Sequence, residues 1–305
     1  MTADILCLGE PLIEFVRRDD GLYQRSIGGD TSNAAVAAAK QGASVGYITS
    51  LGAGQFGDAV IDYWRQEGID AAHVARHPTA QTGLNFVDPD PAGRFFTYRR
   101  KGSAASLMRP EDLPAEAIRA ARCLHLSGIT LAVSEDLRET AFAAMAIANT
   151  AEAPVSFDTN LRLALWDVEA ARTVTHEAMK SAMIAVTSID DSLHLTGLVD
   201  PAAIAAFYHD LGPRIVLVTM GAEGCHLSVG GAATLIPPFP TTPIDSTGAG
   251  DSFAGSFLAY WLETGDPVLA ARRAGIVAAG TVAGLGAVQP IPRRDEVLRK
   301  EAEAL

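Results

Sequence analysis

From about residue 110 onward, short apolar runs alternate with segments whose apolar residues recur at helical spacing. Predicted strands begin near residues 123, 154, 183 and 214, and predicted helices span about 135–150, 168–181, 201–210, 249–263 and 267–283. Strands that alternate with helices build a parallel sheet, and the crossover helices cover its two faces. The pattern therefore predicts a three-layer α/β/α sandwich.

The N-terminal part of the chain adds two strand–helix pairs to this sandwich. A strand is predicted from Ile5 to Leu8, and the helix that follows is predicted to take Thr31-Ser32 as its N-cap and to end at Gly42. A second strand over SVGYITSLG leads into a helix predicted over about 57–67.

Two segments, about 11–30 and 82–102, interrupt this order with β patterns, and the second shows a hairpin with its turn at 90–93. Ligands in open α/β sheets bind beyond the carboxyl ends of the strands. These segments are therefore predicted to form a small β-sheet lid over such a site. No linker separates them from the rest, so 1–305 is predicted to be a single domain.

The charge balance argues against two classes of partner. Lys and Arg number 24 and Asp and Glu number 36 among 305 residues, which gives a formal net charge of −12. The sequence contains no block of like charge. A chain this acidic lacks the basic surface that binds nucleic acid or an anionic membrane, so neither partner is expected.

The cysteines and apolar runs indicate the cellular compartment. Cys7, Cys123 and Cys225 are far apart and odd in number, which argues against a secreted disulfide framework. The N-terminal sequence does not have the basic and apolar regions of a signal peptide. The longest apolar run has 15 residues, fewer than the roughly 20 that span a bilayer. We expect a soluble, cytoplasmic protein.

The stretch from Asp245 to Phe253, DSTGAGDSF, is the most informative for chemistry. Apolar residues then recur at helical spacing, so a buried helix is predicted to begin near Ala249. Gly248 and Gly250 let the backbone turn tightly, and the N–H groups of the first helical turn suit a phosphoryl group. Asp251 stands in this turn, where it can accept a proton from a substrate hydroxyl. An ordinary glycine-rich loop with an acidic first turn would share these features.

Two stretches together resemble the signatures of a known family. DSTGAGDSFAGSF is similar to the C-terminal signature of the ribokinase-like, or PfkB, carbohydrate kinases, and GGDTSNAAVAAAKQGASVGYITSLGAGQFGDAV resembles their N-terminal signature. The resemblance covers essentially the whole chain and implies the same sandwich with a β lid. It implies that Asp251 is the catalytic base, that the backbone of Gly248, Ala249 and Gly250 with Asp251 forms an anion hole, and that ATP and Mg²⁺ are the cofactors.

Within the family, three stretches are similar to 2-keto-3-deoxygluconate kinases: Tyr98 to Ser106, Phe157 to Arg162, and Gly28 to Asn33. That substrate is an acid sugar, and Arg100 and Arg162 are predicted to hold its carboxylate through charge-assisted hydrogen bonds. Arg100 could instead be an exposed charge on a strand, and Arg162 could serve a nucleotide phosphate.

The resemblance also implies which residues contact the rest of the sugar. Gly29, Asp30 and Asn33 would bind its hydroxyl groups, and Tyr98 would stack on it or bond to it from the lid. Asn85 stands where some relatives have a lid tyrosine. A small amide can still bond a hydroxyl, although it shields the site less.

The resemblance identifies the nucleotide site less specifically than the sugar site. The residues that the resemblance places near ATP are Asn160, Ser188, Thr219, Gly221, Gly224, Gly248, Gly250 and Ala278. A plain β-turn would account equally well for the glycines at 221 and 224. Relatives usually have Asn-x-x-Glu where this chain has Ser188 and Asp191, and Asp191 is predicted to hold a hydrated Mg²⁺ through water.

These observations predict an enzyme that phosphorylates a primary hydroxyl of 2-keto-3-deoxygluconate with ATP. Another sugar kinase of this fold, such as a fructokinase or ribokinase, is the first alternative. A catalytically weak sugar-binding regulatory protein is the second, and only Ser188 and Asp191 suggest it. Apolar lid residues (Leu22, Phe86, Phe95 and Phe96) predict a homo-oligomer that forms through the lid.

Overall fold

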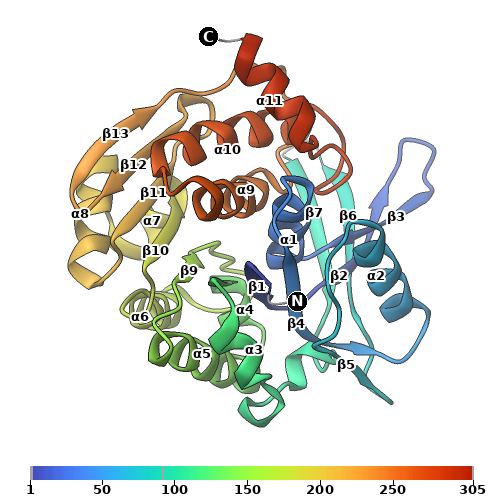
Figure 1. The fold of residues 1–305 in the computed structure, drawn as a ribbon. Coiled ribbons are helices and arrows are strands. Elements are labelled where there is room, and N and C mark those ends of the chain that lie inside the picture. Colours follow the sequence, from blue (N-terminus) through green and yellow to red (C-terminus); the bar gives the residue numbers. More distant parts are fainter. Residues whose placement is uncertain (1–2, 91–92, 304–305) are drawn as a thin grey trace.

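The computed structural model describes residues 3–90 and 93–303. Within these residues, nine strands form a central sheet in the order β13-β12-β11-β10-β9-β8-β1-β4-β5 (Figure 1). Its strands are β1 (Ile5–Leu8), β4 (Val45–Gly52), β5 (Val74–His77), β8 (Cys123–Ser127), β9 (Val155–Asp158), β10 (Ile184–Ser188), β11 (Ile215–Thr219), β12 (Cys225–Val229) and β13 (Ala232–Ile236).

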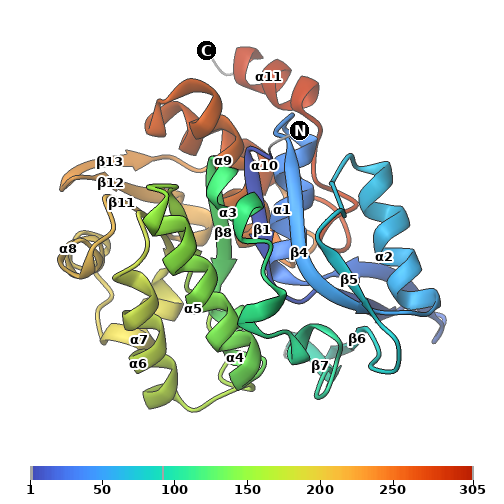
Figure 2. The same cartoon turned by 60° about the horizontal axis from the view of Figure 1, so that its bottom comes forward.

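The central sheet is parallel from β5 to β11, and β12 and β13 pair antiparallel at one edge. Figure 2 shows this edge on the opposite side of the molecule from β4 and β5. Residues in register on the inner strands, such as Ile5 with Val45 and Cys123, are buried. Parallel strands need crossover connections, and helices supply most of them here.

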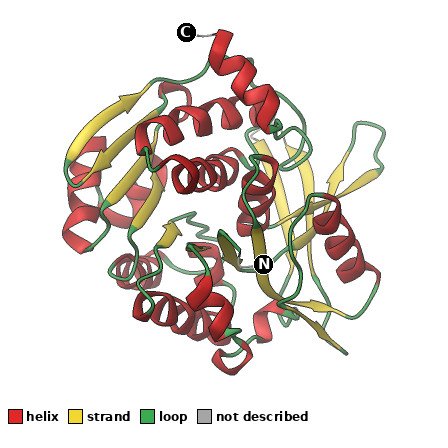
Figure 3. Cartoon of the chain, in the orientation of Figure 1, coloured by secondary structure: helices red, strands yellow, loops and turns green. Residues whose placement is uncertain are grey.

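Helices cover both faces of this sheet (Figure 3). Along β1, Ile5 and Cys7 belong to one buried apolar cluster and Leu6 and Leu8 to another, as the alternation of side chains along a strand requires. The first face is covered by α1 (Asp30–Lys40), α2 (Gln55–Gln66), α9 (Ala249–Thr264), α10 (Pro267–Val282) and α11 (Arg294–Glu303). The second is covered by α3 (Ala115–Ala120), α4 (Gly128–Ala132), α5 (Glu135–Thr150), α6 (Val168–Met179) and α8 (Pro201–Leu211), with α7 (Ile189–Thr196) beside α6. The predicted three-layer sandwich is confirmed.

The predicted lid is also present, as a second sheet in the order β3-β2-β6-β7. Its strands are β2 (Leu12–Arg17), β3 (Tyr23–Gly28), β6 (Gly83–Asp90) and β7 (Gly93–Arg99), which Figure 1 shows together at one end of the central sheet. Phe15 stacks on Phe86 at 5.2 Å between ring centroids and meets Phe56 of α2 at 5.9 Å. Part of the predicted hairpin turn, 91–92, lies outside the described residues.

One predicted cap is wrong. Helix α1 begins at Asp30, after Gly29, which has a φ of 100°. Thr31 and Ser32 lie inside the helix with their hydroxyls engaged elsewhere, Thr31 with the Tyr47 hydroxyl at 2.6 Å and Ser32 as the acceptor of the Trp64 indole N–H at 3.1 Å. Their hydroxyls therefore satisfy buried aromatic side chains rather than the helix end.

None of the helices in the described part of the chain has the length and hydropathy needed to span a membrane.

Candidate active site

A cavity of about 360 Å³ lies where the carboxyl ends of β9, β10 and β11 meet the lid and the first turns of α1 and α9. This is the position expected for a ligand of an open α/β sheet. The predicted site residues that line it are Gly29, Asp30, Asn33, Asn85, Tyr98, Arg100, Asn160, Arg162, Ser188, Asp191, Thr219, Gly248, Ala249, Gly250 and Asp251. Segments far apart in the sequence therefore converge on one pocket.

Asp251 is held from two sides in the first turn of α9. The side-chain amide of Asn33, on α1, donates to one of its carboxylate oxygens at 2.9 Å. The amide of Asn160, after β9, donates to the other oxygen at 2.9 Å. Each oxygen keeps a further lone pair, so the carboxylate is oriented and can still accept a proton.

Burial, and secondly the nearby charge of Asp30, raise the pKa of Asp251 to about 7 against the lowering effects of Asn33, Arg162 and Asn160. A carboxyl group with a pKa near neutrality is well matched to general base catalysis, because it is both available and basic at the working pH. The surroundings of Asp251 therefore suit the role that the sequence predicts for it.

The backbone before α9 is shaped by contacts that only glycine allows. Gly248 has a φ of 75°, and a Cβ atom there would lie 2.8 Å from the Ala287 carbonyl oxygen. The loop that contains Ala287 is fixed in turn, since the Gly286 N–H donates to Asp245 at 2.8 Å. The Ala249 N–H donates to the Ser246 carbonyl at 3.2 Å. The N–H groups of Gly250 and Asp251 belong to the first turn, where a helix has no acceptor of its own, and they can bind an anion.

Among the residues predicted to bind the sugar, two amides have unused acceptors. Asn85 donates to Glu14 at 3.2 Å, and the side-chain oxygens of Asn33 and Asn85 are buried with no hydrogen-bond partner in the described residues. Asp30 accepts a hydrogen bond from the Ser127 hydroxyl. Buried acceptors without partners are costly unless a ligand supplies donors, and sugar hydroxyl groups would do so.

The two predicted carboxylate ligands differ in their surroundings. Arg100 is buried and pairs with Glu10, with Nε at 2.6 Å from Oε2, so the alternative of an exposed strand charge is wrong. The sequence does not predict this partner. Arg162 is exposed at the cavity wall, and its Nη1 donates to the Leu161 carbonyl at 2.8 Å. Unlike Arg100, Arg162 makes no ion pair within the described residues.

The residues predicted to bind the nucleotide have structural partners that the sequence does not predict. Ser188 is the N-cap of α7 and accepts a hydrogen bond from the Asp191 N–H at 3.0 Å. Asp191 accepts from the Thr159 hydroxyl at 2.8 Å and from the Leu161 N–H at 3.1 Å. The amide of Asn160 donates to Asp251 rather than pointing to an open nucleotide site. Their predicted contacts with ATP or Mg²⁺ stay predictions.

Gly221, Gly224 and Ala278 are not among the residues that line this cavity. Gly224 has a φ of 94°, and a Cβ atom there would overlap the Ile236 carbonyl oxygen. The turn between β11 and β12 therefore requires a glycine at this position for conformational reasons alone. The predicted contacts of Gly221, Gly224 and Ala278 with ATP remain predictions, and the residues that line the cavity do not support them.

Asp158 also lines the cavity, and its place at a strand end predicts that it could position a phosphate or a magnesium-bound water. It ends β9 and is buried, and burial with the charges of Asp251, Asp191 and Asp30 raises its pKa well above the usual range. Among the described residues, no three His, Cys, Asp or Glu side chains are grouped to hold a metal alone. Hard oxygen donors beside a cavity nevertheless fit a Mg²⁺ ion that keeps several water ligands. Glu14 and Thr187 also line the cavity and were not predicted.

Comparison with known proteins places the chain among sugar kinases. Residues 2–294 match the model of the pfkB family of carbohydrate kinases. The chain is 33% identical to the 2-dehydro-3-deoxygluconokinase of Thermoproteus tenax, over 97% of this chain and 94% of that protein. It is 32% identical to probable fructokinase-4 of Arabidopsis thaliana, over 83% of this chain and 81% of that protein. The structure of the Xylella fastidiosa fructokinase with bound ATP matches with a TM-score of 0.92 at 28% identity, over 100% of this chain and 99% of that chain.

Proposed function

The chain belongs to the pfkB family of carbohydrate kinases, and within that family we propose that it phosphorylates a primary hydroxyl of 2-keto-3-deoxygluconate (2-dehydro-3-deoxygluconate) with ATP. One observation carries the chemistry: Asp251 stands at the N-terminus of α9, fixed between Asn33 and Asn160 and facing the cavity. A base and an anion-binding helix end in one place are what phosphoryl transfer to an alcohol requires.

In this proposal, Asp251 accepts the proton of the attacking hydroxyl. The N–H groups of Gly250 and Asp251 stabilise the negative charge on the phosphoryl group as it moves, whereas the Ala249 N–H is already bonded to the Ser246 carbonyl. Asp158 and Asp191 would hold Mg²⁺ through water, and the ion, when bound, neutralises the charge of the phosphate oxygens. The buried acceptors of Asn33 and Asn85 would orient the sugar.

Two arginines at the cavity support an acid sugar. Arg162 is the better candidate for the carboxylate, because Glu10 already compensates the charge of Arg100. That same ion pair favours a second candidate function, a fructokinase, because a cavity with one uncompensated arginine has less need of an anionic substrate. The fructokinase-4 relative is 32% identical over 83% of this chain, against 33% over 97% for the 2-dehydro-3-deoxygluconokinase.

Arg162→Gln separates the two substrates. A charge-assisted hydrogen bond contributes roughly 1.5–3 kcal/mol, so kcat/KM for 2-keto-3-deoxygluconate should fall at least about tenfold. The value for fructose should change less, because fructose has no carboxylate and loses only the effect of Arg162 on the pKa of Asp251. Steady-state kinetics with Mg-ATP measures both, and Arg119→Gln, which removes an exposed arginine on α3, is the control. Equal losses on the two sugars, or a wild type that prefers fructose, would reject the acid-sugar assignment.

We propose, in addition, that the chain forms a homo-oligomer through the lid. Leu22 and Phe95 are 66% and 63% exposed on the lid, and β3 and β7 are edge strands with unpaired backbone groups. Phe86 does not contribute, since it stacks on Phe15, and Phe96 lines the cavity. Light scattering at micromolar concentration should give a mass of at least twice the 32.0 kDa chain, and a monomer would contradict the proposal.

A further inference from the structure

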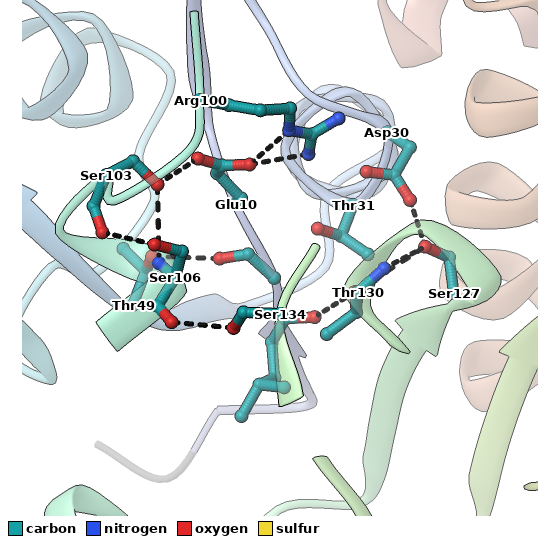
Figure 4. A network of polar contacts seen from close by, with 12 residues as sticks. Glu10, Asp30, Thr31, Thr49, Arg100, Ser103, Ser106, Ser127, Thr130 and Ser134 are labelled. Carbon is teal, nitrogen blue, oxygen red and sulfur yellow. Dashed lines mark hydrogen bonds and ion pairs between the residues drawn. The ribbon is translucent and has the colours of Figure 1, made fainter. Parts of the chain in front are cut away.

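Glu10 is a buried carboxylate at the junction between the two sheets. It follows β1 of the central sheet and precedes β2 of the lid, and its side chain is 0% exposed. Isolated charges are not stable in such places, so a buried carboxylate needs partners that match its charge. Figure 4 shows these partners around it.

The partners come from the end of the lid hairpin. The Nε and Nη2 atoms of Arg100 lie 2.6 and 2.5 Å from one oxygen of Glu10. The Ser103 hydroxyl donates to the other oxygen, so Glu10 is held on both sides (Figure 4). Ser106 donates its N–H to the Ser103 hydroxyl at 3.3 Å, and Ser134, the N-cap of α5, donates to the Ser106 carbonyl at 2.6 Å. The network therefore connects the lid to the sandwich.

Glycines on the remaining sides allow Glu10 to fit. A Cβ atom at Gly83, the first residue of β6, would lie 2.7 Å from the Glu10 carboxylate. A Cβ atom at Gly29, just before α1, would lie 2.5 Å from the Glu10 carbonyl oxygen. Glu10 thus lies against the first residue of β6, the residue that follows β7, and the start of the helix that carries Asp30 and Asn33.

The ion pair has a consequence for the charge of the cavity. Arg100 lines the cavity with Arg162, whereas the Glu10 side chain lies behind it and is not among the lining residues. Burial raises the pKa of the Glu10 carboxyl, while Arg100 and Ser103 act to lower it. A contact as short as that with Arg100 is typical of an ionised carboxylate paired with a guanidinium. One of the two cations that an anionic sugar would meet is therefore already compensated.

From this geometry we propose that Glu10 is a specificity-determining positioning residue. It fixes Arg100 at the cavity wall, and its negative charge limits how strongly the cavity favours an acid sugar over a neutral one. The inference rests on the proposed sugar-kinase function, but it does not depend on which of the two sugars is the natural substrate.

Glu10→Gln tests the proposal, because the amide keeps an acceptor for Arg100 and a donor for Ser103 while removing one negative charge. The ratio of kcat/KM for 2-keto-3-deoxygluconate to kcat/KM for fructose should rise at least about fivefold, since uncompensated Arg100 would attract the carboxylate. A purely structural residue would lower both values and leave the ratio within about twofold of the wild type, and that result would overturn the proposal.

Two further variants keep the test decisive if Glu10→Gln folds poorly. Arg100→Gln removes the cation that Glu10→Gln would leave uncompensated, so the ratio must not rise above the wild-type value; a rise would overturn the proposal. Ser103→Ala loosens Glu10 without changing any charge, so the ratio must stay near the wild-type value; a rise equal to that of Glu10→Gln would assign the effect to lid mobility and overturn it. Glu263→Gln, which breaks the surface pair with Arg294, controls for net charge.

Calorimetric titration without ATP measures the Kd of each sugar, and the ratio of the two Kd values reports the same preference for the acid sugar over the neutral one. This measurement does not require turnover. A protein that phosphorylates neither sugar would refute the proposed function, while the change in the Kd ratio in Glu10→Gln would still support or overturn the role of Glu10.

Discussion

Asp251→Asn is expected to lower kcat by at least about 10²-fold, which is the usual contribution of a general base, while ATP still binds. The substitution preserves the size of the side chain but removes the proton acceptor. The site can accommodate an amide here, because the side-chain oxygen of Asn33 has no hydrogen-bond partner in the described residues. That amide can rotate and accept from the new donor. Steady-state turnover and nucleotide titration measure the two quantities separately.

The pH profile gives an independent check on the same residue. Asp251 has a pKa raised to about 7, so it is a base only when deprotonated, above that value. Wild-type kcat/KM should therefore rise with pH and level off above about 7. The rise should be absent in Asp251→Asn, which has no group to titrate at this position. Near-normal turnover in the variant, or an unchanged pH profile, would remove Asp251 from the role of base.

Much of the fold was predictable because its strands are buried on both faces. Strands such as β10 (IAVTS) and β11 (IVLVT) are short, almost continuous apolar runs. Helix α5 is long enough for its apolar residues to show the helical period. The sequence does not predict α4 or α7. Helix α4 has five residues, too few to show helical spacing. The first turn of α7 contains two aspartates, a residue type that is also common in turns.

The residues that line the candidate site were predictable where the signatures contain them, but the contacts between distant residues were not. The motif around Asp251 indicates a base at a helix N-terminus. The hydrogen bonds that Asn33 and Asn160 donate to Asp251 join residues that are 218 and 91 positions apart in the sequence. Glu10 and Arg100 are 90 residues apart, and nothing in either local pattern indicates the other. Pairings between distant side chains follow from the packing of the sheets, which a single sequence does not encode locally.

Gly248→Ala is the second substitution with a large expected effect. A residue with a side chain at a φ of 75° is strained by roughly 1–2 kcal/mol. The new Cβ atom would also lie 2.8 Å from the carbonyl oxygen and 2.9 Å from the Cβ atom of Ala287. Because Asp245 fixes the neighbouring Gly286, the loop of Ala287 resists moving away. We therefore expect the backbone of Gly248 to shift instead, taking the first turn of α9 with it.

A shift of this kind moves the N–H groups of Gly250 and Asp251 relative to the phosphoryl group, and it moves the base as well. Misplacement on the order of 1 Å can cost about 10²-fold in rate, so kcat should fall by about that factor and the unfolding temperature should also decrease. Gly250→Ala is the matched control for stability, because no atom lies within 4 Å of its added Cβ. Thermal unfolding of the two variants and single-turnover kinetics of Gly248→Ala measure these effects. If Gly248→Ala unfolded at the temperature of Gly250→Ala and kept wild-type kcat, the left-handed turn at Gly248 would not be what positions the anion-binding end of α9.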